Sequence, residues 1–302
     1  MLRNGGGGVT FQKLPIEGLA PVAREVRKEV IRMLGTAGSG HPGGSLSATD
    51  ILTALFFHVM RHDPANPAWE ERDRFVLSKG HGVPALYAAM ALCGYFPKEQ
   101  LSRLRRMGSP LQGHPDTRFL PALEACTGSL GQGLSISSGL ALAAKMDARK
   151  TWTYCLLSDG ENQEGQTWEA AAFAGFHQLD RLIAFLDYNK FQLDGPVQKI
   201  LDLEPVVQKW ESFRWHVQEV NGHDIAQILG AVELAQRTPG RPHLIVAHTN
   251  KGKGVSFMEN NNHFHGVAPN AEETQAALKE LDGDPSLSRA LVAAGRIKQG
   301  GK

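Results

Sequence analysis

Short apolar runs alternate with longer helical patterns through most of this chain. The runs are short and bounded by turn residues, which predicts buried strands; they cover residues 74–78, 152–157, 182–186, 215–220 and 242–248. Helical periodicity covers residues 16–35, 47–60, 84–93, 97–107, 134–146, 164–179 and 225–237. Strands that alternate with helices predict an α/β fold with a parallel sheet flanked by helices.

The ends of the chain differ in pattern from the rest. Residues 1–13 contain the run Gly5–Gly8, which predicts a flexible N-terminal segment. Residues 14–282 carry the strand and helix patterns, and residues 283–302 form a polar, helix-prone tail. No internal repeat or proline-rich linker interrupts the middle of the sequence. One domain over residues 14–282 is the simpler interpretation.

Composition and charge exclude several classes of protein. Hydrophobic residues make up 42% of the 302 positions, charged residues 21%, and the net charge is +1. This balance gives no reason to expect nucleic acid or a membrane surface as a partner, since both are bound through clustered basic charge. The local cluster Arg103, Arg105 and Arg106 is interpreted as a solvated helix face. No signal peptide or membrane span is evident, so cytoplasm is the expected location.

The three cysteines give no sign of a disulfide framework or a metal site. Cys93, Cys126 and Cys155 are widely separated, odd in number and lack metal-ligand spacing. We interpret all three as reduced, buried, structural thiols of a cytosolic protein.

Polar residues follow three of the predicted strands. His81, Asp159 and Asn189 fall beyond carboxyl ends of strands, where parallel sheets bind ligands. A carboxylate and a carboxamide at the ends of neighbouring strands can share a hard divalent cation through oxygen. Gly160 leaves space beside Asp159, and a helix starting just after it would direct N–H groups at a diphosphate.

Asp159-Gly160 and Asn189, separated by 28 residues, resemble the signature of thiamine-diphosphate enzymes, although Ser158 and Lys190 depart from its common form. Further segments, in order and over about residues 15–270, resemble the transketolase family. They are the glycine-flanked histidine loops at 39–44, 73–81 and 113–115, the loop at 127–133, and the closing segments at 251–254 and 265–266.

This resemblance implies the thiamine-diphosphate-binding fold and a set of site residues. The metal, Mg²⁺ or alternatively Ca²⁺ or Mn²⁺, would be held by Asp159, Asn189 and the carbonyl of Phe191. Thiamine diphosphate would be bound by His81, Gly128, Ser129, Leu130, Asp159, Gly160, Glu161, Asn189 and His265. The catalytic residues would be His41, His81, His114 and His265, with Glu164 at an interface that couples two cofactor sites.

Several nearby histidines are left out of this set. His265 is preferred to His263 because the His-Gly pair is what matches the family. His58, His177 and His223 are interpreted as structural. Neutral imidazoles of the four chosen histidines could donate or accept hydrogen bonds around a reacting carbonyl and move protons near neutral pH.

The resemblance also implies a partner. In this family the carboxylate that activates the aminopyrimidine belongs to a second domain, for which about thirty residues beyond Gly266 give no room. The chain is therefore expected to be the N-terminal subunit of a split transketolase. It would pair with a C-terminal subunit that carries the pyrimidine-binding domain, as a heterotetramer, and transfer a two-carbon ketol unit from a ketose phosphate to an aldose phosphate.

Two alternatives remain open at the level of sequence. One is a related thiamine enzyme with a different sugar, such as a deoxyxylulose-phosphate synthase-like or sulfosugar-specific ketol transferase. The other is a non-catalytic cofactor-binding subunit. The presence of the metal pair together with all four loop histidines argues against a silent subunit, which would need none of them.

Overall fold

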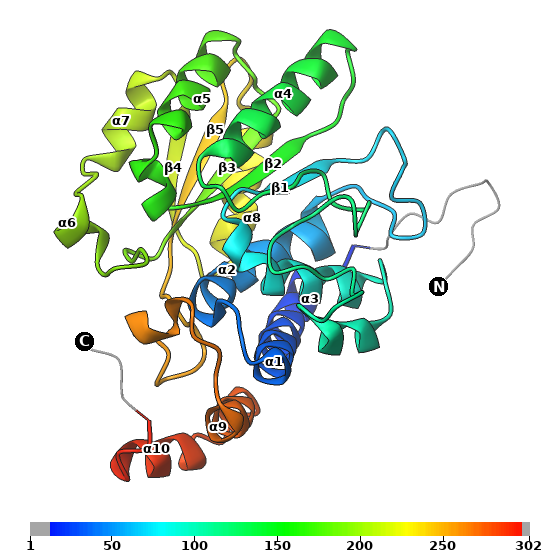
Figure 1. Cartoon of the computed structure of the whole chain (residues 1–302). Coiled ribbons are helices and arrows are strands. Elements are labelled where there is room, and N and C mark those ends of the chain that lie inside the picture. Colours follow the sequence, from blue (N-terminus) through cyan, green and yellow to red (C-terminus); the bar gives the residue numbers. More distant parts are fainter. Residues whose placement is uncertain (1–12, 298–302) are drawn as a thin grey trace.

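Five parallel strands form a sheet in the order β1-β2-β3-β5-β4 (Figure 1). The computed structural model describes residues 13–297, so the flexible segment expected at the N-terminus lies, except for Lys13, outside the described residues. The strands are β1 (Arg74–Leu77), β2 (Thr153–Ser158), β3 (Leu182–Tyr188), β4 (His216–Asn221) and β5 (His243–His248). The predicted α/β fold is confirmed, and each predicted strand is present.

The two faces of the sheet build two apolar clusters, because successive side chains of a strand point to opposite faces. Tyr154 and Leu156 of β2 pack with side chains of α1 (Leu19–Ala37), α2 (Pro42–Ala54), α3 (Val83–Cys93) and α8 (Ile225–Arg237). Cys155 and Leu157 pack with α4 (Gln132–Met146), α5 (Gly165–Phe176) and α7 (Val206–Ser212). Figure 1 shows α4, α5 and α7 together on one side.

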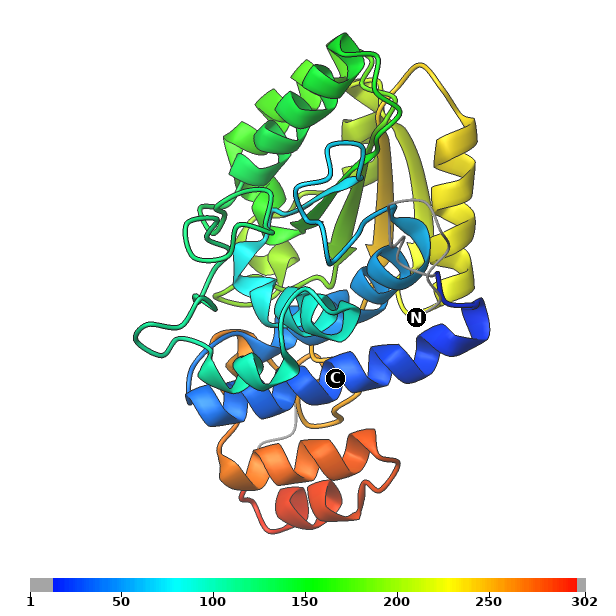
Figure 2. The same ribbon diagram turned by 90° about the vertical axis from the view of Figure 1, so that its right-hand side faces the viewer.

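The C-terminal helices lie far from the sheet. α1 packs against α2, α3 and α9 (Ala271–Leu281), and α10 (Ser286–Ala293) packs in turn on α9. Figure 2 shows α9 and α10 at the end of the molecule opposite the helices of the α4 face. Residue 282 as the end of the domain stays a prediction. None of the helices in residues 13–297 combines the length and hydropathy of a membrane span.

Short helical segments complete the secondary structure. They are the 3₁₀ turns η1 (Ile16–Gly18), η3 (Gly80–Gly82), η4 (Lys98–Arg103), η5 (Gly160–Gln163) and η6 (Asn262–His265), the π-helical turn η2 (Leu55–Val59) and the single-turn helix α6 (Val197–Ile200). Two of them, η3 and η5, begin directly after the ends of β1 and β2 and carry residues of the predicted site.

Three expectations are wrong in detail. The helix expected over 97–107 is only the turn η4, because the backbone leaves the helical region at Leu104 (ψ 130°) and turns left-handed at Arg105 (φ 59°). Arg105 and Arg106 are exposed but lie outside any helix. The helix expected to start at residue 47 starts at Pro42, whose fixed φ suits the first helical turn. Cys126 is exposed, unlike the buried Cys93 and Cys155.

Candidate active site

Every strand of the sheet ends at one edge, and the predicted site residues meet there. β1 is followed by Lys79 and His81, β2 by Asp159, β3 by Asn189, and β5 by a turn that holds Lys251. Because all five strands are parallel, these segments, far apart in the sequence, share the carboxyl edge.

Four histidine rings form one cluster at this edge. The ring centroid of His41 lies 5.4 Å from that of His81, 6.2 Å from that of His114 and 5.8 Å from that of His265. His81 and His265 stack at 5.4 Å. His263 points elsewhere, with its exposed ring against Phe264. The structure thus brings together all four histidines that the sequence singled out and excludes the competitor.

Glycines let the loops of this cluster approach closely. Gly128 has φ 135°, and a Cβ there would lie 2.8 Å from the His114 ring. A Cβ on Gly80 would lie 2.7 Å from the backbone nitrogen of Gly128. A side chain at position 80 would therefore push the second histidine loop away from the loop at 127–133, and one at position 128 would displace the His114 ring.

The cluster is neutral at pH 7. Burial, reinforced by the charge of Arg105, lowers the pKa of His41 to about 4. Burial and Lys251 lower the pKa of His265 to about 3, and burial and Lys79 hold the pKa of His81 well below its usual value. Each ring therefore keeps one donor and one acceptor nitrogen for hydrogen bonding. The Nδ1 atom of His41 is buried and has no hydrogen-bond partner among the described residues.

Asp159 and Asn189 lie next to each other with oxygens available. One Asp159 carboxylate oxygen accepts the Gly160 N–H at 2.8 Å, and the other accepts the N–H of Lys190, the residue after Asn189. Asn189 Oδ1 accepts the N–H of Phe191 at 3.1 Å. Burial and the neighbouring charge of Asp187 raise the pKa of Asp159 to about 7. A bound cation would remove this electrostatic cost.

The proposed ligand set suits a hard cation. It contains a carboxylate, a carboxamide and a main-chain carbonyl, all oxygen donors. Within residues 13–297 no three His, Cys, Asp or Glu side chains are grouped as a metal site, which leaves this mixed set as the candidate.

Asp187, near the end of β3, links several segments at the carboxyl edge of the sheet. It was not identified from the sequence. Its carboxylate pairs with the Lys79 ammonium and accepts hydrogen bonds from Ser47 Oγ at 2.6 Å and from Thr249 Oγ1. Burial alone would raise the pKa of Asp187, but Lys79 and these hydroxyls together hold it below the usual value. The one signal in the sequence is an acid inside an otherwise apolar strand.

Lys251 is the second residue that sequence reasoning missed. Its side chain is 1% exposed, and its Nζ lies 2.6 Å from His265 Nδ1 and 3.2 Å from Asn262 Oδ1. Burial lowers the pKa of Lys251 to about 8. No carboxylate among the described residues pairs with it. The family resemblance over 251–254 gives this lysine no role of its own.

Glu161, which was predicted to bind the cofactor, is fully buried. Its carboxylate accepts from Ser78 Oγ, from the Gly131 N–H at 2.7 Å and from the Ser158 N–H at 3.2 Å. It therefore ties three loops together, and its contact with the cofactor stays a prediction. The helix expected just after Gly160 is also different, since Gly160–Gln163 is a 3₁₀ turn and α5 starts only at Gly165.

The remaining predicted residues lie at the surface of the site. Ser129 is exposed, and Leu130 is half-buried in the same loop. Glu164 is exposed and precedes α5 without capping it through its side chain. Arg105, which was not predicted, lies with its guanidinium against Gly113: a Cβ there would be 2.7 Å from Arg105 Nε. Its charge contributes to the lowered pKa of both His41 and His114.

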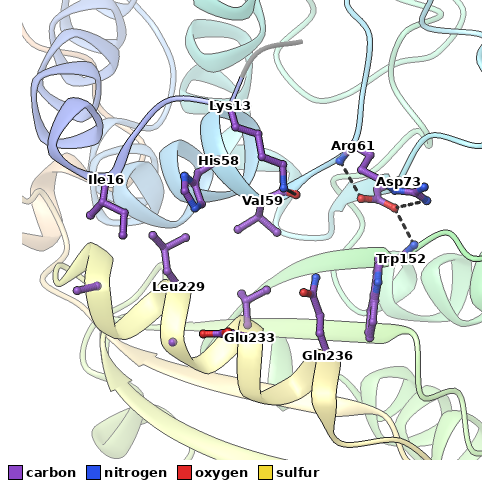
Figure 3. Close-up of a pocket in the computed structure, with 13 residues that line it drawn as sticks. Lys13, Ile16, His58, Val59, Arg61, Asp73, Trp152, Leu229, Glu233 and Gln236 are labelled. Atoms are coloured by element: carbon purple, nitrogen blue, oxygen red, sulfur yellow. Dashed lines mark hydrogen bonds and ion pairs between the residues drawn. The ribbon is translucent and has the colours of Figure 1, made fainter. Parts of the chain in front are cut away.

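A separate pocket of about 600 Å³ lies along α8 and reaches Asp73 and Trp152, which precede β1 and β2 at the amino edge of the sheet (Figure 3). Its charged groups are satisfied within the chain: Arg61 pairs with Asp73 at 3.4 Å, and Lys13 donates to the Val59 carbonyl at 3.0 Å. Glu233 pairs with Arg237. The pocket contains none of the four clustered histidines, so we assign the chemistry to the carboxyl edge.

Comparison with known proteins agrees with this site. The family model described as "Transketolase, thiamine diphosphate binding domain" matches residues 20–293. A 6-deoxy-6-sulfo-D-fructose transketolase subunit, SqwG, from Clostridium sp. (strain MSTE9) is 51% identical over 260 residues, which cover 86% of this chain and 94% of that protein. An apulose-4-phosphate transketolase subunit from Phocaeicola vulgatus is 40% identical over 89% of this chain and 95% of that protein.

Solved structures give the same result for the fold. A transketolase from Campylobacter jejuni superposes with a TM-score of 0.83 at 36% identity and covers 90% of this chain. The chain spans 44% of that protein's length. The chain belongs to the transketolase family and carries its thiamine diphosphate binding domain. The class of enzyme expected from the sequence, a transketolase subunit, is confirmed.

Proposed function

We propose that this chain binds thiamine diphosphate and a divalent metal, and that with a second subunit it transfers a two-carbon ketol unit between sugars. The observation that carries the proposal is a pair of buried charges of opposite sign at the carboxyl edge. Asp159 and Lys251 are each about 1% exposed, and neither forms an ion pair with another described residue. Buried charges without partners are costly, so a metal and a diphosphate are the complement that this edge requires.

The residues fit both groups. Asp159, Asn189 and the carbonyl of Phe191 would hold Mg²⁺, with Ca²⁺ or Mn²⁺ as alternatives of the same oxygen preference. Lys251, His81 and His265 would face the diphosphate. Gly128, Ser129 and Leu130 would lie along the aminopyrimidine. When bound, thiamine diphosphate supplies the carbanion that breaks and forms the carbon–carbon bond beside a ketose carbonyl.

The histidine cluster would handle the protons of the sugars. The lowered pKa values leave His41 and His265 neutral at pH 7, so each can accept a proton from a sugar hydroxyl or donate one to a carbonyl oxygen. The unpartnered Nδ1 of His41 is free to make such a hydrogen bond. His114, exposed at the rim, would contact the part of the sugar that enters last.

The second subunit would supply the pyrimidine-binding domain. Support comes from two relatives named as subunits, of which this chain covers 94% and 95%, whereas it covers 44% of the Campylobacter jejuni transketolase. The exposed Glu164 is our candidate for an interface residue that couples two cofactor sites, in a heterotetramer. Cytoplasm remains our proposed location.

A ketose phosphate is one candidate donor and a sulfonated ketose is the second. The second is favoured by the 51% identity to the subunit named for 6-deoxy-6-sulfo-D-fructose. Both donors carry a tetrahedral anionic group at one end and a hydroxyketone at the other. The four histidines would recognise the hydroxyketone end, which the two donors share.

The test is a ketol-transfer assay with Mg²⁺ and thiamine diphosphate, run with this chain alone and mixed with a separately produced subunit that carries a pyrimidine-binding domain. Xylulose 5-phosphate and 6-deoxy-6-sulfo-D-fructose would be compared as donors to an aldose phosphate. We expect activity only in the mixture, with one donor preferred at least tenfold in kcat/KM. Activity of the chain alone would overturn the partner, and no activity with either donor would favour a silent cofactor-binding subunit.

A further inference from the structure

The turn that carries Lys251 is held by residues outside the histidine cluster. Its backbone leaves β5 at His248 and passes through Gly252, where φ is 83° and a Cβ would lie 2.2 Å from the Met258 carbonyl oxygen. The Gly252 N–H donates to the Gly43 carbonyl at 3.0 Å. Only glycine fits this tightly packed turn, and the turn must be held in place if the buried lysine is to keep one position.

His223, interpreted from the sequence only as structural, makes two hydrogen bonds that reach this turn. Its Nε2 accepts the Asn250 N–H at 2.8 Å, which leaves Nδ1 to carry the proton. Nδ1 then donates to Asp50 Oδ2 at 2.8 Å. The ring therefore connects the carboxylate of Asp50 in α2 with the residue directly before Lys251.

Asp50 holds the other side of the turn through Arg27. The Arg27 guanidinium binds both carboxylate oxygens of Asp50, at 3.0 and 2.5 Å, and its Nε donates to the Lys253 carbonyl at 3.1 Å. Asp50 is 5% exposed and Arg27 is 8% exposed. One buried carboxylate thus fixes the backbone at residues 250 and 253, with Lys251 and Gly252 between the two attachments.

We propose that His223, Asp50 and Arg27 are positioning residues that clamp the backbone of residues 250–253 and so set where the Lys251 ammonium meets an anionic ligand. The ligand would be the diphosphate of the cofactor, so this inference rests on the proposed function. None of the three residues touches the cluster of His41, His81, His114 and His265. They would affect ligand binding only indirectly, by fixing the position of the turn that holds Lys251.

Two substitutions of His223 separate the two hydrogen bonds. In His223→Asn the amide lies near the Nδ1 position, so it can donate to Asp50 but is too short to reach the Asn250 N–H. In His223→Gln the amide oxygen lies near the Nε2 position and can accept that N–H. Both His223 and Asn250 line a cavity of about 600 Å³, so an unpaired amide there meets water.

The first measurement is hydrogen exchange of the full chain without cofactor. In His223→Asn we expect the amides of residues 250–253 to exchange at least tenfold faster, with α8 and β4 unchanged. His223→Gln should restore most of the protection. Unchanged exchange at residues 250–253 in His223→Asn overturns the clamp, whatever the cofactor does.

The second measurement is titration of the full chain with thiamine diphosphate and Mg²⁺. We expect Kd to rise about tenfold in His223→Asn, to return toward wild type in His223→Gln, and to rise in Lys251→Met. The double variant His223→Asn/Lys251→Met should bind no more weakly than Lys251→Met alone. If the losses of affinity in the two single variants add up in the double variant, His223 does not act through Lys251. Failure of the wild-type chain to bind would contradict the proposed function, and the exchange result would still decide the clamp.

Discussion

The neighbouring strands β2 and β3 end in buried carboxylates whose pKa values are shifted in opposite directions. Asp187 at the end of β3 is paired with Lys79 and hydrogen-bonded to two hydroxyls, and its pKa lies below the usual value. Asp159, directly after β2, accepts backbone N–H groups and forms no ion pair with any of the described residues, and its pKa is raised to about 7. Both are fully enclosed, so burial does not distinguish them.

The difference separates framework from binding site. A buried charge that its own fold neutralises contributes to holding the strands and loops in register. A buried charge that is left without a cation, as at Asp159, is a candidate for binding a ligand. Glu161 shares its burial and a pKa raised to about 7, but its carboxylate accepts a hydroxyl and two backbone N–H groups. The two lysines repeat the contrast, because Lys79 is paired with Asp187 and Lys251 has no carboxylate partner among residues 13–297.

The largest expected effect comes from breaking the framework pair. Lys79→Met leaves the Asp187 carboxylate buried without its cation, which typically costs about 3–5 kcal/mol. We expect the free energy of unfolding, measured in urea without ligands, to fall by that amount. The double variant Lys79→Met/Asp187→Asn should recover much of the loss, since no charge is then left unpaired. A single variant as stable as wild type would contradict the framework role.

A change of opposite sign is expected at the end of β2. Asp159→Asn removes an uncompensated buried charge, but it turns an NH2 group toward one of the two backbone N–H groups that the carboxylate accepts. The metal-free chain should therefore become more stable by only about 1–2 kcal/mol, a fraction of what the raised pKa implies. Mg²⁺ with thiamine diphosphate should raise the Tm of the wild-type chain and leave that of the variant unchanged. Asp187→Asn is the matched control, and it should lower the Tm. A destabilised Asp159→Asn would place Asp159 in the framework as well.

The parts of this site that the sequence predicted are those with local signals. The strand ends at Asp159 and Asn189 followed from apolar runs and the residues directly after them, and the histidine loops followed from their glycines. No local pattern indicated the roles of Lys79, Asp187 and Lys251. Lys79 and Asp187 pair across 108 residues of sequence. Lys251 has no carboxylate partner among the described residues, and its proposed partner is a ligand. The state of a buried charge depends on such distant neighbours.

Short-range rules also failed where the backbone turns unexpectedly. The helical pattern of 97–107 gave no warning of the left-handed Arg105, which puts that guanidinium beside Gly113 and the histidines. Cys126 was expected inside but is exposed on the loop before Gly128, with its sulfur accepting from the Thr117 N–H at 3.4 Å. In both cases tertiary contacts decided the position of the side chain.

The smallest expected effect concerns the neutral histidines. Like Asp159, these partly buried side chains have a pKa shifted toward the uncharged form. His41 has a pKa of about 4 in the folded chain and 6.5 ordinarily, so the unfolded chain takes up its proton first as the pH falls. The free energy of unfolding therefore receives the full contribution of the neutral His41 ring above pH 6.5, and this contribution is lost as the pH falls toward 4. Because the ring is partly exposed, we expect about 1 kcal/mol from this residue between pH 7 and pH 5.

Urea unfolding at a series of pH values tests this contribution. His41→Asn cannot titrate, so its stability should fall less steeply between pH 7 and pH 5 than that of the wild-type chain. His263→Asn is the control, because His263 is exposed outside the cluster and its replacement should leave the slope unchanged. If His41→Asn and wild type lose stability in parallel, the His41 ring is not held neutral by the fold. The proton transfers assigned to it would then need another residue of the cluster.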